Sequence, residues 1–397
     1  MRANALVVSM LTVIMIGVIA VPCVRADVPA QAHWRYLLYL DADNSLDVNA
    51  GAHHLPVVQS DFDELMSVGS SKDVVVYVLV DRVAGPANLF KVNRGSMTEL
   101  KDFALDGQEA NMGDPATLRA FVEYTFEAAP AEHTLLMFWD HGSPLSVATD
   151  DHPSDRLTVK EVIQALSGYR VDVIGADECL VGQVDVAYEW LKGGLDTQYL
   201  LVSETYTGWR GYPYDTTLRR MVDTPTMSPR EVAIAFVEET QKLLSKPPYS
   251  GEEVNCHAAV DMSKVGPLVS SLMDLTKLLS SDMKASKNIV SKARGEACFS
   301  YGANAMNVVD LKTFVEVISQ GSSSPAIKAL CARVLSDFDQ TVIALQATRT
   351  TDHQINGLGV VFPNHSWETP SYYWSYAFMA DGWQAFLQSY WAAAGSV

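Results

Sequence analysis

The chain has 397 residues, and hydrophobic residues make up 48% of them, which excludes a disordered chain without a packed core. Its formal net charge is −18, which disfavours nucleic acid and anionic membrane surfaces as partners and favours cationic substrates. We expect a monomer with no nucleic-acid partner and no membrane contact after export.

Residues 1–26 have the layout of a secretory signal peptide. Arg2 gives a basic start, an almost wholly apolar run spans Ala5–Val21, and Val24–Ala26 supplies the cleavage signal. A retained membrane anchor is the alternative, because the apolar run is close to the shortest length that spans a bilayer. We expect cleavage before Asp27 and a secreted or periplasmic protein.

Residues 27–220 alternate apolar runs with amphipathic helices. The expected strands are Trp34–Leu40, Asp73–Val80, His133–Trp139, Val171–Ala176 and Gln198–Val202. Their nearly continuous apolar character is typical of strands that are covered on both faces. The expected helices begin at Asp114-Pro115, at the capping box Thr158–Glu161 and at Leu180. This alternation predicts an α/β core with a mostly parallel sheet between helices.

Residues 221–397 are expected to form a mainly helical C-terminal subdomain. The expected helices run over Ser228–Lys246, over Ser263–Leu279, and from Pro325 along an apolar stripe that reaches Val342 and Leu345. Leu358–Phe362 returns to a strand pattern. We therefore expect this subdomain to rejoin the sheet through its last strand.

Four cysteines follow the expected cleavage site, at Cys179, Cys256, Cys298 and Cys331. They are far apart, and they form no Cys-x-x-Cys pair and no zinc-ligand spacing with histidine. A disulfide among the last three stays open at this point. We expect at least one cysteine to be free for chemistry.

Two motifs follow neighbouring expected strands. FWDHGS places His141 and Gly142 after one strand, and VIGADECL places Asp177 and Cys179 after the next. Open α/β sheets have their active sites at the carboxyl ends of parallel strands, so these motifs should meet. A cysteine with a histidine that ionises it is the minimum set for acyl transfer.

The surroundings of Cys179 support the same chemistry. A helix expected from Leu180 would direct its N-terminus toward the thiolate, and the N–H groups of Gly142 and Cys179 are natural donors to an oxyanion. The competing interpretation is a buried core cysteine and a loop histidine without function, and the pattern alone does not exclude it.

Further motifs occur in order along the chain: YLDADNSL at 39–46, NMGDPATLRAF at 111–121, GLGVVFP at 357–363, and an aromatic tail through Trp383 and Phe386. With the two strand-end motifs they resemble the clostripain family of cysteine peptidases. The resemblance implies a caspase-like three-layer sandwich, with His141 as general base and Cys179 as nucleophile. It also implies that Asp177 lies at the base of the P1 pocket and favours Arg or Lys there. A strand-end cap is the structural alternative for Asp177.

The sequence departs from the family pattern near the expected pocket. Ser143–Ser146 replaces a glycine-rich stretch, and Thr207–Asp215 matches the usual loop only loosely. Glu204 and Asp215 are both open as a second pocket carboxylate. Relatives are often activated by a cut between the histidine and the cysteine, and Arg156 is the residue here after which we expect such self-cleavage.

Other candidate sites are weaker. Asp41–Asn44 lacks the glycine and the closing glutamate of an EF-hand, so we expect a turn that hydrogen-bonds its own backbone. His53-His54 with Asp61 and Asp63 is interpreted as a solvated loop. We expect no metal site and no cofactor, although calcium occurs in parts of the family and stays open here.

The sequence thus predicts a secreted cysteine endopeptidase that cuts peptides after basic residues. Two alternatives remain. One is a secreted binding protein that keeps the fold but has lost hydrolysis, which the altered stretch after His141 favours. The other is a metal-dependent hydrolase around Asp41 and Asp43.

Overall fold

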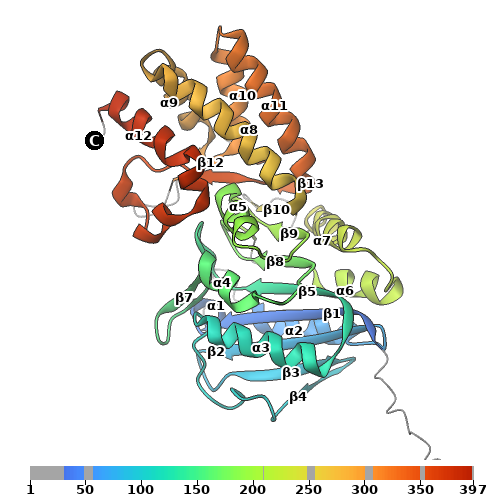
Figure 1. Ribbon diagram of the computed structural model, residues 1–397. Helices are drawn as coiled ribbons and strands as arrows, with labels where there is room; N and C mark the ends of the chain where they lie inside the picture. Colours follow the sequence, from blue (N-terminus) through green and yellow to red (C-terminus); the bar gives the residue numbers. More distant parts are fainter. Residues whose placement is uncertain are drawn as a thin grey trace, which may run out of the picture. The chain divides into compact units, whose positions relative to one another are not determined.

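The computed structural model describes residues 31–48, 57–208, 210–247, 255–299, 307–348 and 354–395. Within these ranges nine strands form one sheet in the order β13-β10-β9-β8-β5-β1-β2-β3-β4 (Figure 1). The strands are β1 (Ala32–Ala42), β2 (Val74–Arg82), β3 (Asn88–Asn93), β4 (Ser96–Glu99), β5 (Ala131–Trp139), β8 (Val173–Asp177), β9 (Tyr199–Val202), β10 (Asn255–Asp261) and β13 (Val342–Thr348). The expected signal peptide lies outside the described residues.

The five central strands are parallel, and the strands at both edges are antiparallel. β9, β8, β5, β1 and β2 pair in parallel, whereas β3-β4 at one edge and β10-β13 at the other run antiparallel to their neighbours. The five parallel strands are the five expected from their apolar runs. The prediction of a mostly parallel sheet is therefore confirmed.

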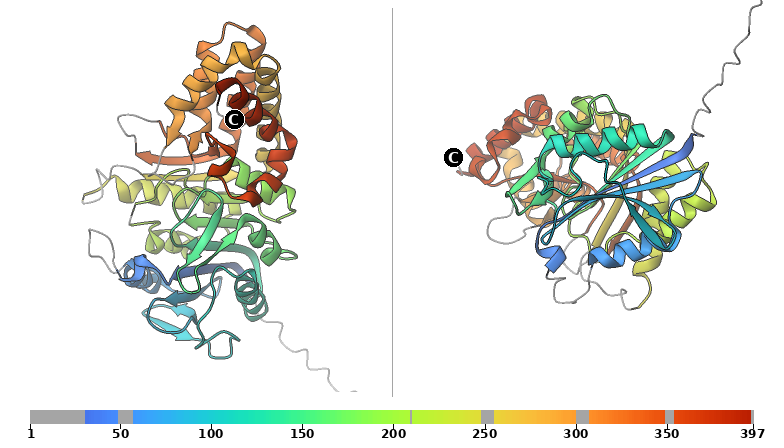
Figure 2. Two further views of the ribbon diagram at one scale, coloured as in Figure 1. Left: turned by 90° about the vertical axis from the view of Figure 1, so that its left-hand side faces the viewer. Right: turned by 90° about the horizontal axis from the view of Figure 1, so that it is seen from below.

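Helices cover both faces of the sheet (Figure 2). One layer packs on the face that presents Leu37 and Tyr39, and the other on the face that presents Tyr36 and Leu38. The first layer contains α3 (Pro115–Ala128), α4 (Val159–Leu166), α5 (Val184–Lys192) and α8 (Met262–Ser281), and the second contains α2 (Val57–Val68), α6 (Tyr214–Asp223) and α7 (Pro229–Leu244). The side chains of β1 alternate between the two layers, as the pleat of a strand requires.

Capping residues begin α3 and α4 where the sequence predicts. The Asp114 side chain accepts a hydrogen bond from the amide of Ala116, and Pro115 opens α3. Thr158 and Glu161 form the predicted capping box of α4. These local bonds satisfy backbone N–H groups that the first helical turn leaves without partners.

The C-terminal part is mainly helical, with α9 (Met283–Ala297), α10 (Leu311–Gly321), α11 (Pro325–Thr341) and α12 (Gln384–Ala394). A separate small sheet contains β11 (Cys298–Phe299), β12 (Val308–Asp310) and β14 (Gly359–Val361). The expected strand at 358–362 thus exists but belongs to this small sheet. The C-terminal part rejoins the main sheet through β10 and β13 instead.

The predicted extent of the α11 helix was wrong at its end. The helix ends at Thr341, and Val342 and Leu345 lie in β13.

The apolar core is continuous from α3 to α12 across residue 220, and the domain boundary at that residue stays a prediction.

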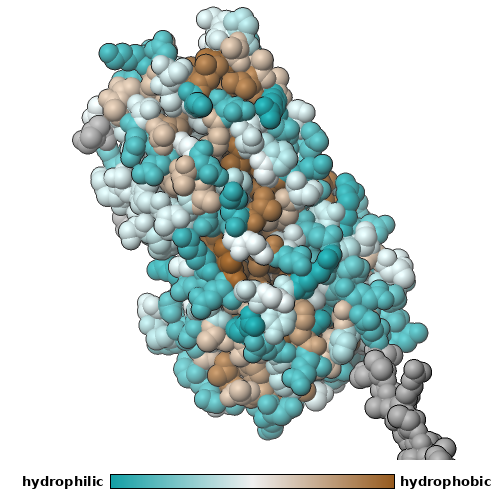
Figure 3. Space-filling view, in the orientation of Figure 1, coloured by the Kyte–Doolittle hydropathy of each residue, from teal (hydrophilic) through white to brown (hydrophobic). Residues whose placement is uncertain are grey.

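Hydrophilic residues cover most of the face shown in Figure 3, where hydrophobic residues are exposed in small groups. In the ranges that the structure describes, no helix combines the length and apolarity needed to cross a membrane.

The four cysteines in these ranges are free thiols, so the disulfide left open among Cys256, Cys298 and Cys331 is not formed.

Candidate active site

Two chain segments leave the sheet side by side at the carboxyl ends of β5 and β8. Trp139, the last residue of β5, is in register with Asp177, the last residue of β8. The segment Asp140–Gly142 therefore lies next to Glu178 and Cys179. This is the arrangement that the two sequence motifs predict.

The backbones of these segments touch at Gly142. A Cβ atom on Gly142 would lie 2.1 Å from the carbonyl oxygen of Cys179 and 3.0 Å from its amide nitrogen, so no larger residue fits. Within the described ranges, neither the Gly142 N–H nor the Cys179 N–H donates a hydrogen bond.

His141 is exposed, and its Nε2 lies 2.9 Å from the Ser45 hydroxyl. Desolvation by the surrounding protein lowers the pKa of His141. Its main chain is held by Asp140, whose Oδ1 accepts hydrogen bonds from the His141 amide and, at 2.6 Å, from Asn44 Nδ2. Among the described residues, no hydrogen bond joins the imidazole to Cys179.

The Cys179 thiol is half-buried and faces the loop that follows β9. Its Sγ lies 3.6 Å from Thr207 Oγ1 and 3.4 Å from the Thr207 amide nitrogen, which donates to it. Burial raises the pKa of Cys179, and the hydrogen bonds from Thr207 oppose this shift only in part. The thiol therefore resists ionisation in the observed conformation.

The chain after Cys179 is held by neighbouring strands. Leu180 and Gly182 donate from their amides to the carbonyl oxygens of Thr205 and Ser203, each at 2.7 Å. Leu180 has a φ of 69°, a left-handed conformation that is rare outside glycine. The expected helix therefore starts only at Val184, and the predicted support of a thiolate by its N-terminus directly after Cys179 is wrong.

Asp177 points to the second helical layer and is only 6% exposed. Its Oδ2 accepts hydrogen bonds from the Tyr212 amide at 3.0 Å and from the Tyr214 hydroxyl at 2.8 Å. Burial raises the pKa of Asp177 to about 6. Gly211 packs directly against this carboxylate, because a Cβ atom there would lie 2.3 Å from Oδ2. The loop after β9 thus covers Asp177.

Glu178, the first residue after β8, points to the opposite face of the sheet from Asp177. Its Oε1 accepts a hydrogen bond from the Ala148 amide at 3.2 Å. Burial, with repulsion from Asp41 and Asp177, raises the pKa of Glu178 well above its usual range. A buried carboxyl group thus lies behind the segment that carries His141.

Neither residue left open as a second pocket carboxylate contacts Asp177 in the described parts of the chain. Glu204 accepts hydrogen bonds from the amides of Asn356 and Gly357, at 2.7 and 2.9 Å. Asp215 accepts one from the amide of Thr216 in the first turn of α6. Both carboxylates therefore have local structural partners.

The interpretation of Asp61 and Asp63 as part of a solvated loop was wrong. Both lie in α2, and Asp61 is buried, with its Oδ2 accepting a hydrogen bond from Trp139 Nε1 at 2.8 Å. Burial, together with charge repulsion from Asp177, raises the pKa of Asp61 well above its usual range. The apolar spacing of Val58, Phe62 and Leu65 is the signal that could have predicted this helix. His53-His54 lies outside the described residues.

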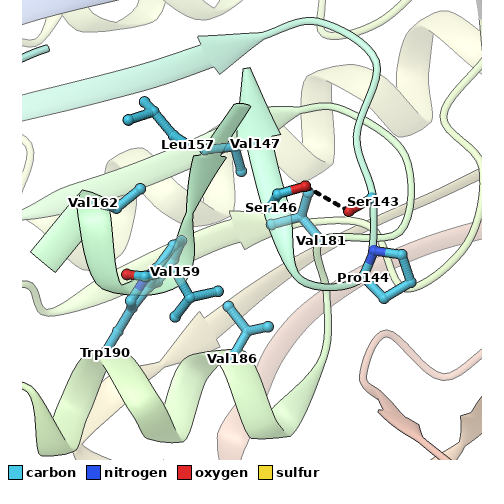
Figure 4. A pocket seen from close by; sticks show the side chains of 10 residues that line it. All are labelled: Ser143, Pro144, Ser146, Val147, Leu157, Val159, Val162, Val181, Val186 and Trp190. Atoms are coloured by element: carbon cyan, nitrogen blue, oxygen red, sulfur yellow. Dashed lines mark hydrogen bonds between the residues drawn. The ribbon is translucent and has the colours of Figure 1, made fainter. Parts of the chain in front are cut away.

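The Ser143–Ser146 segment, where the sequence departs from the family pattern, lies along a narrow crevice between apolar side chains (Figure 4). The Ser143 and Ser146 hydroxyls beside it hydrogen-bond each other at 2.7 Å (Figure 4). The remaining lining residues are Pro144, Val147, Leu157, Val159, Val162, Val181, Val186 and Trp190. Most of these belong to the first helical layer, on the face away from Asp177.

Arg156 lies in a short hairpin of β6 (Ser146–Asp150) and β7 (Asp155–Thr158). It is exposed and is paired with Thr149 across the hairpin. The backbone of β7 packs against Gly113, where a Cβ atom would lie 2.4 Å from the Arg156 amide nitrogen. A cut after Arg156 therefore requires the hairpin to open.

The Asp41–Asn44 segment forms the predicted self-bonded turn. Asp41 Oδ1 accepts a hydrogen bond from the Asp43 amide at 3.2 Å, and Asn44 Nδ2 donates to the Asp41 carbonyl oxygen at 3.3 Å. In the part of the chain that the structure describes, no group of three or more His, Cys, Asp or Glu residues is arranged to hold a metal ion.

A mostly parallel sheet with a cysteine and a histidine at adjacent strand ends is an arrangement that a cysteine peptidase can use. The chain belongs to the clostripain family, peptidase family C11, whose family model matches residues 38–391. Clostripain from Hathewaya histolytica is 25% identical in an alignment of 219 residues, and the match covers 45% of this chain and 40% of clostripain. The matched region thus spans less than half of that enzyme.

Two solved structures share the fold over almost their whole lengths. A secreted C11 cysteine protease from Bacteroides thetaiotaomicron, in complex with an irreversible peptide inhibitor, is 18% identical with a TM-score of 0.65. The alignment covers 91% of this chain and 99% of that one. An inactive zymogen C11 protease from Parabacteroides distasonis is 16% identical with a TM-score of 0.67, over 89% of this chain and 99% of that one. At these identities the likeness concerns the fold alone.

Proposed function

We propose that the protein is an exported cysteine endopeptidase that hydrolyses peptide bonds after Arg or Lys. The observation that carries the proposal is the contact between Gly142 and the Cys179 backbone, which keeps the His141 and Cys179 segments together. Membership of the clostripain family supports the reaction class. The peptide inhibitor bound by the Bacteroides thetaiotaomicron relative supports a peptide substrate.

In the proposed reaction, the Cys179 sulfur attacks the substrate carbonyl carbon while His141 accepts the thiol proton. His141 then donates this proton to the leaving amine, and water hydrolyses the thioester that remains. The N–H groups of Gly142 and Cys179 stabilise the oxyanion in both steps. For this, the imidazole exchanges its bond to Ser45 for one to the thiol, a rearrangement common between resting and substrate-bound sites.

Asp177 is proposed to select a basic P1 side chain by a charge-assisted hydrogen bond. Its buried carboxylate lies on the strand that leads to Cys179, two residues before it. Because Gly211 and Tyr212 cover the carboxylate, the loop after β9 must move when substrate binds. Gly211 leaves no room even for a Cβ atom beside the Asp177 carboxylate. A P1 side chain therefore cannot reach Asp177 in the observed conformation.

Export is proposed from the signal-peptide pattern of residues 1–26 and from the secreted relative in Bacteroides thetaiotaomicron. Self-cleavage after Arg156 is proposed as an activating step. An active preparation that migrates as a single intact band on a denaturing gel would contradict that step.

One assay separates the proposed function from both alternatives. An Arg-P1 reporter peptide is incubated with the wild-type protein, with Cys179→Ala and with Cys298→Ala, a matched control at another half-buried free thiol. We expect cleavage by the wild-type and control proteins that a thiol alkylator stops and a chelator does not, and none by Cys179→Ala. No cleavage by any protein would favour the binding-protein alternative, and cleavage sensitive only to the chelator would favour a metal-dependent hydrolase.

A further inference from the structure

A buried basin of acidic groups lies beneath the loop that covers Asp177. Asp61 and Glu64 project into it from one face of α2, and Asp177 enters it from the end of β8. Tyr214 joins two of the three carboxylates, because its amide donates to Glu64 Oε2 at 2.9 Å and its hydroxyl donates to Asp177 Oδ2. Asp61 and Asp177 interact through charge repulsion. The side chains of Asp61, Glu64 and Asp177 therefore form one polar site.

This basin already binds a guanidinium group of the chain itself. Arg210, in the covering loop, forms an ion pair with Glu64 and donates from Nη1 to Ser60 Oγ at 2.7 Å. Its charge offsets part of the rise in the pKa of Asp61 that burial and Asp177 cause. The basin thus has the acceptors and the electrostatic potential that suit an arginine side chain.

The basin holds more acidic groups than this one cation balances. Asp61 is only 2% exposed, and its Oδ1 has no hydrogen-bond partner. The Tyr36 hydroxyl, whose pKa is raised by burial and by the charges of Asp177 and Asp61, is also buried without a partner. Burial and the charge of Asp177 together raise the pKa of Asp61 well above its usual range. Unpaired buried polar atoms are costly, so a bound cation at this place would be favourable.

We propose that Asp61 is the second carboxylate that binds the basic P1 side chain, together with Asp177. This inference rests on the proposed function. Arg210, Gly211 and Tyr212 belong to the same loop, so one opening movement withdraws the resident guanidinium and uncovers Asp177. The substrate cation then takes the place of Arg210 beside the carboxylates. The exchange involves no covalent step.

The test compares substrates that differ only in charge at P1. The kcat/KM for Arg-P1 and citrulline-P1 reporter peptides is measured for the wild-type protein, for Asp61→Asn and for Asp63→Asn. Citrulline has the shape of arginine without its charge. The amide oxygen introduced by Asp61→Asn can still accept the bond from Trp139, and Asp63 is an exposed carboxylate of the same helix that bonds Gln59. Asp61→Asn therefore removes the charge while keeping the bond to Trp139, and Asp63→Asn is the matched control.

We expect Asp61→Asn to lower the Arg-to-citrulline ratio by about tenfold to a hundredfold, chiefly through KM, as loss of a charged hydrogen bond implies. Asp63→Asn should keep the wild-type ratio. A ratio within about twofold of wild type in Asp61→Asn would overturn the proposal, because a merely structural role slows both substrates equally. Failure of the wild-type protein to cleave either peptide, or cleavage by Cys179→Ala, would instead overturn the proposed function.

Asp61→Glu decides the question if Asp61→Asn does not fold. Its longer side chain keeps the charge but moves it toward the substrate, so the Arg-to-Lys ratio should shift by at least about threefold while the preference over citrulline persists. An unchanged Arg-to-Lys ratio in a folded Asp61→Glu protein would contradict a contact between this residue and P1.

Discussion

His141 Nε2 lies 2.9 Å from the hydroxyl of Ser45, a residue that follows the neighbouring strand β1. The imidazole therefore has a partner other than the thiol in the observed conformation. Cys179 in turn has Thr207 as its partner. The proposed base and nucleophile are thus near each other but separately engaged, so catalysis requires both hydrogen bonds to be exchanged.

Replacement of Ser45 by alanine tests the first of these exchanges. A hydrogen bond of this kind contributes about 1 kcal/mol, so its loss should raise kcat on an Arg-P1 peptide by about fivefold or less, with KM unchanged. Steady-state kinetics of Ser45→Ala measures this directly. A fall in kcat would show instead that Ser45 holds the imidazole in its productive orientation.

Replacement of Gly142 by alanine should abolish activity. The added methyl group would lie 2.1 Å from the Cys179 carbonyl oxygen, which forces apart the two segments and their proposed oxyanion donors. We expect a loss of about a hundredfold or more in kcat on an Arg-P1 peptide. Gly295→Ala, in open space on α9, is the control and should leave activity unchanged. A fully active Gly142→Ala protein would refute the assigned role of this contact.

The pH dependence of alkylation reports the state of the thiol at rest. Burial raises the pKa of Cys179, and desolvation lowers the pKa of His141, so both groups are mainly neutral near pH 7. The rate of iodoacetamide addition at Cys179 should therefore rise by about tenfold per pH unit between pH 7 and 9. Peptide mass spectrometry follows this site alone. A rate that is already constant below pH 7 would show a preformed thiolate.

The buried carboxyls beneath the His141 segment should make stability fall as pH rises. Burial, with repulsion from Asp150, raises the pKa of Asp41 to about 8, against about 4 when the chain is unfolded. Between these values the folded state holds a proton that the unfolded state has lost, so raising the pH favours unfolding. We expect Tm to drop by on the order of 5 °C from pH 5 to pH 8.

Asp41→Asn should flatten this decline, whereas Asp63→Asn, at an exposed site, should not change it. Differential scanning calorimetry across the pH range gives both slopes. Identical slopes in Asp41→Asn and in the wild-type protein would mean that Asp41 is not the group that titrates.

The central sheet could be predicted from sequence because its strands carry continuous apolar runs, whereas the edges could not. At one edge, β3 and β4 are six and four residues long and contain polar side chains, so no continuous apolar run marks them. Val342 and Leu345 keep a helical spacing although they lie in a strand, because β13 follows α11 without a break. Tertiary pairing with β10 overrides the local pattern there.

In the candidate site, too, the local sequence pattern predicts some features, whereas others depend on tertiary contacts. Asp177 and Glu178 face opposite helical layers, as the alternation of side chains along an extended chain requires. The partners Ser45, Thr207 and Asp61 come from three other segments, and no spacing in the sequence relates these to the strand ends. Contacts that depend on how a loop closes cannot be derived from local periodicity.

The most direct test of the central claim is the position of a covalent adduct. An irreversible peptide with Arg next to an electrophilic ketone is added to the active protein, and the modified residue is mapped by mass spectrometry. The proposed function predicts a single adduct on Cys179, absent after prior alkylation and strongly slowed in His141→Ala. An adduct on Cys256, Cys298 or Cys331, or hydrolysis that continues without any modification, would contradict it.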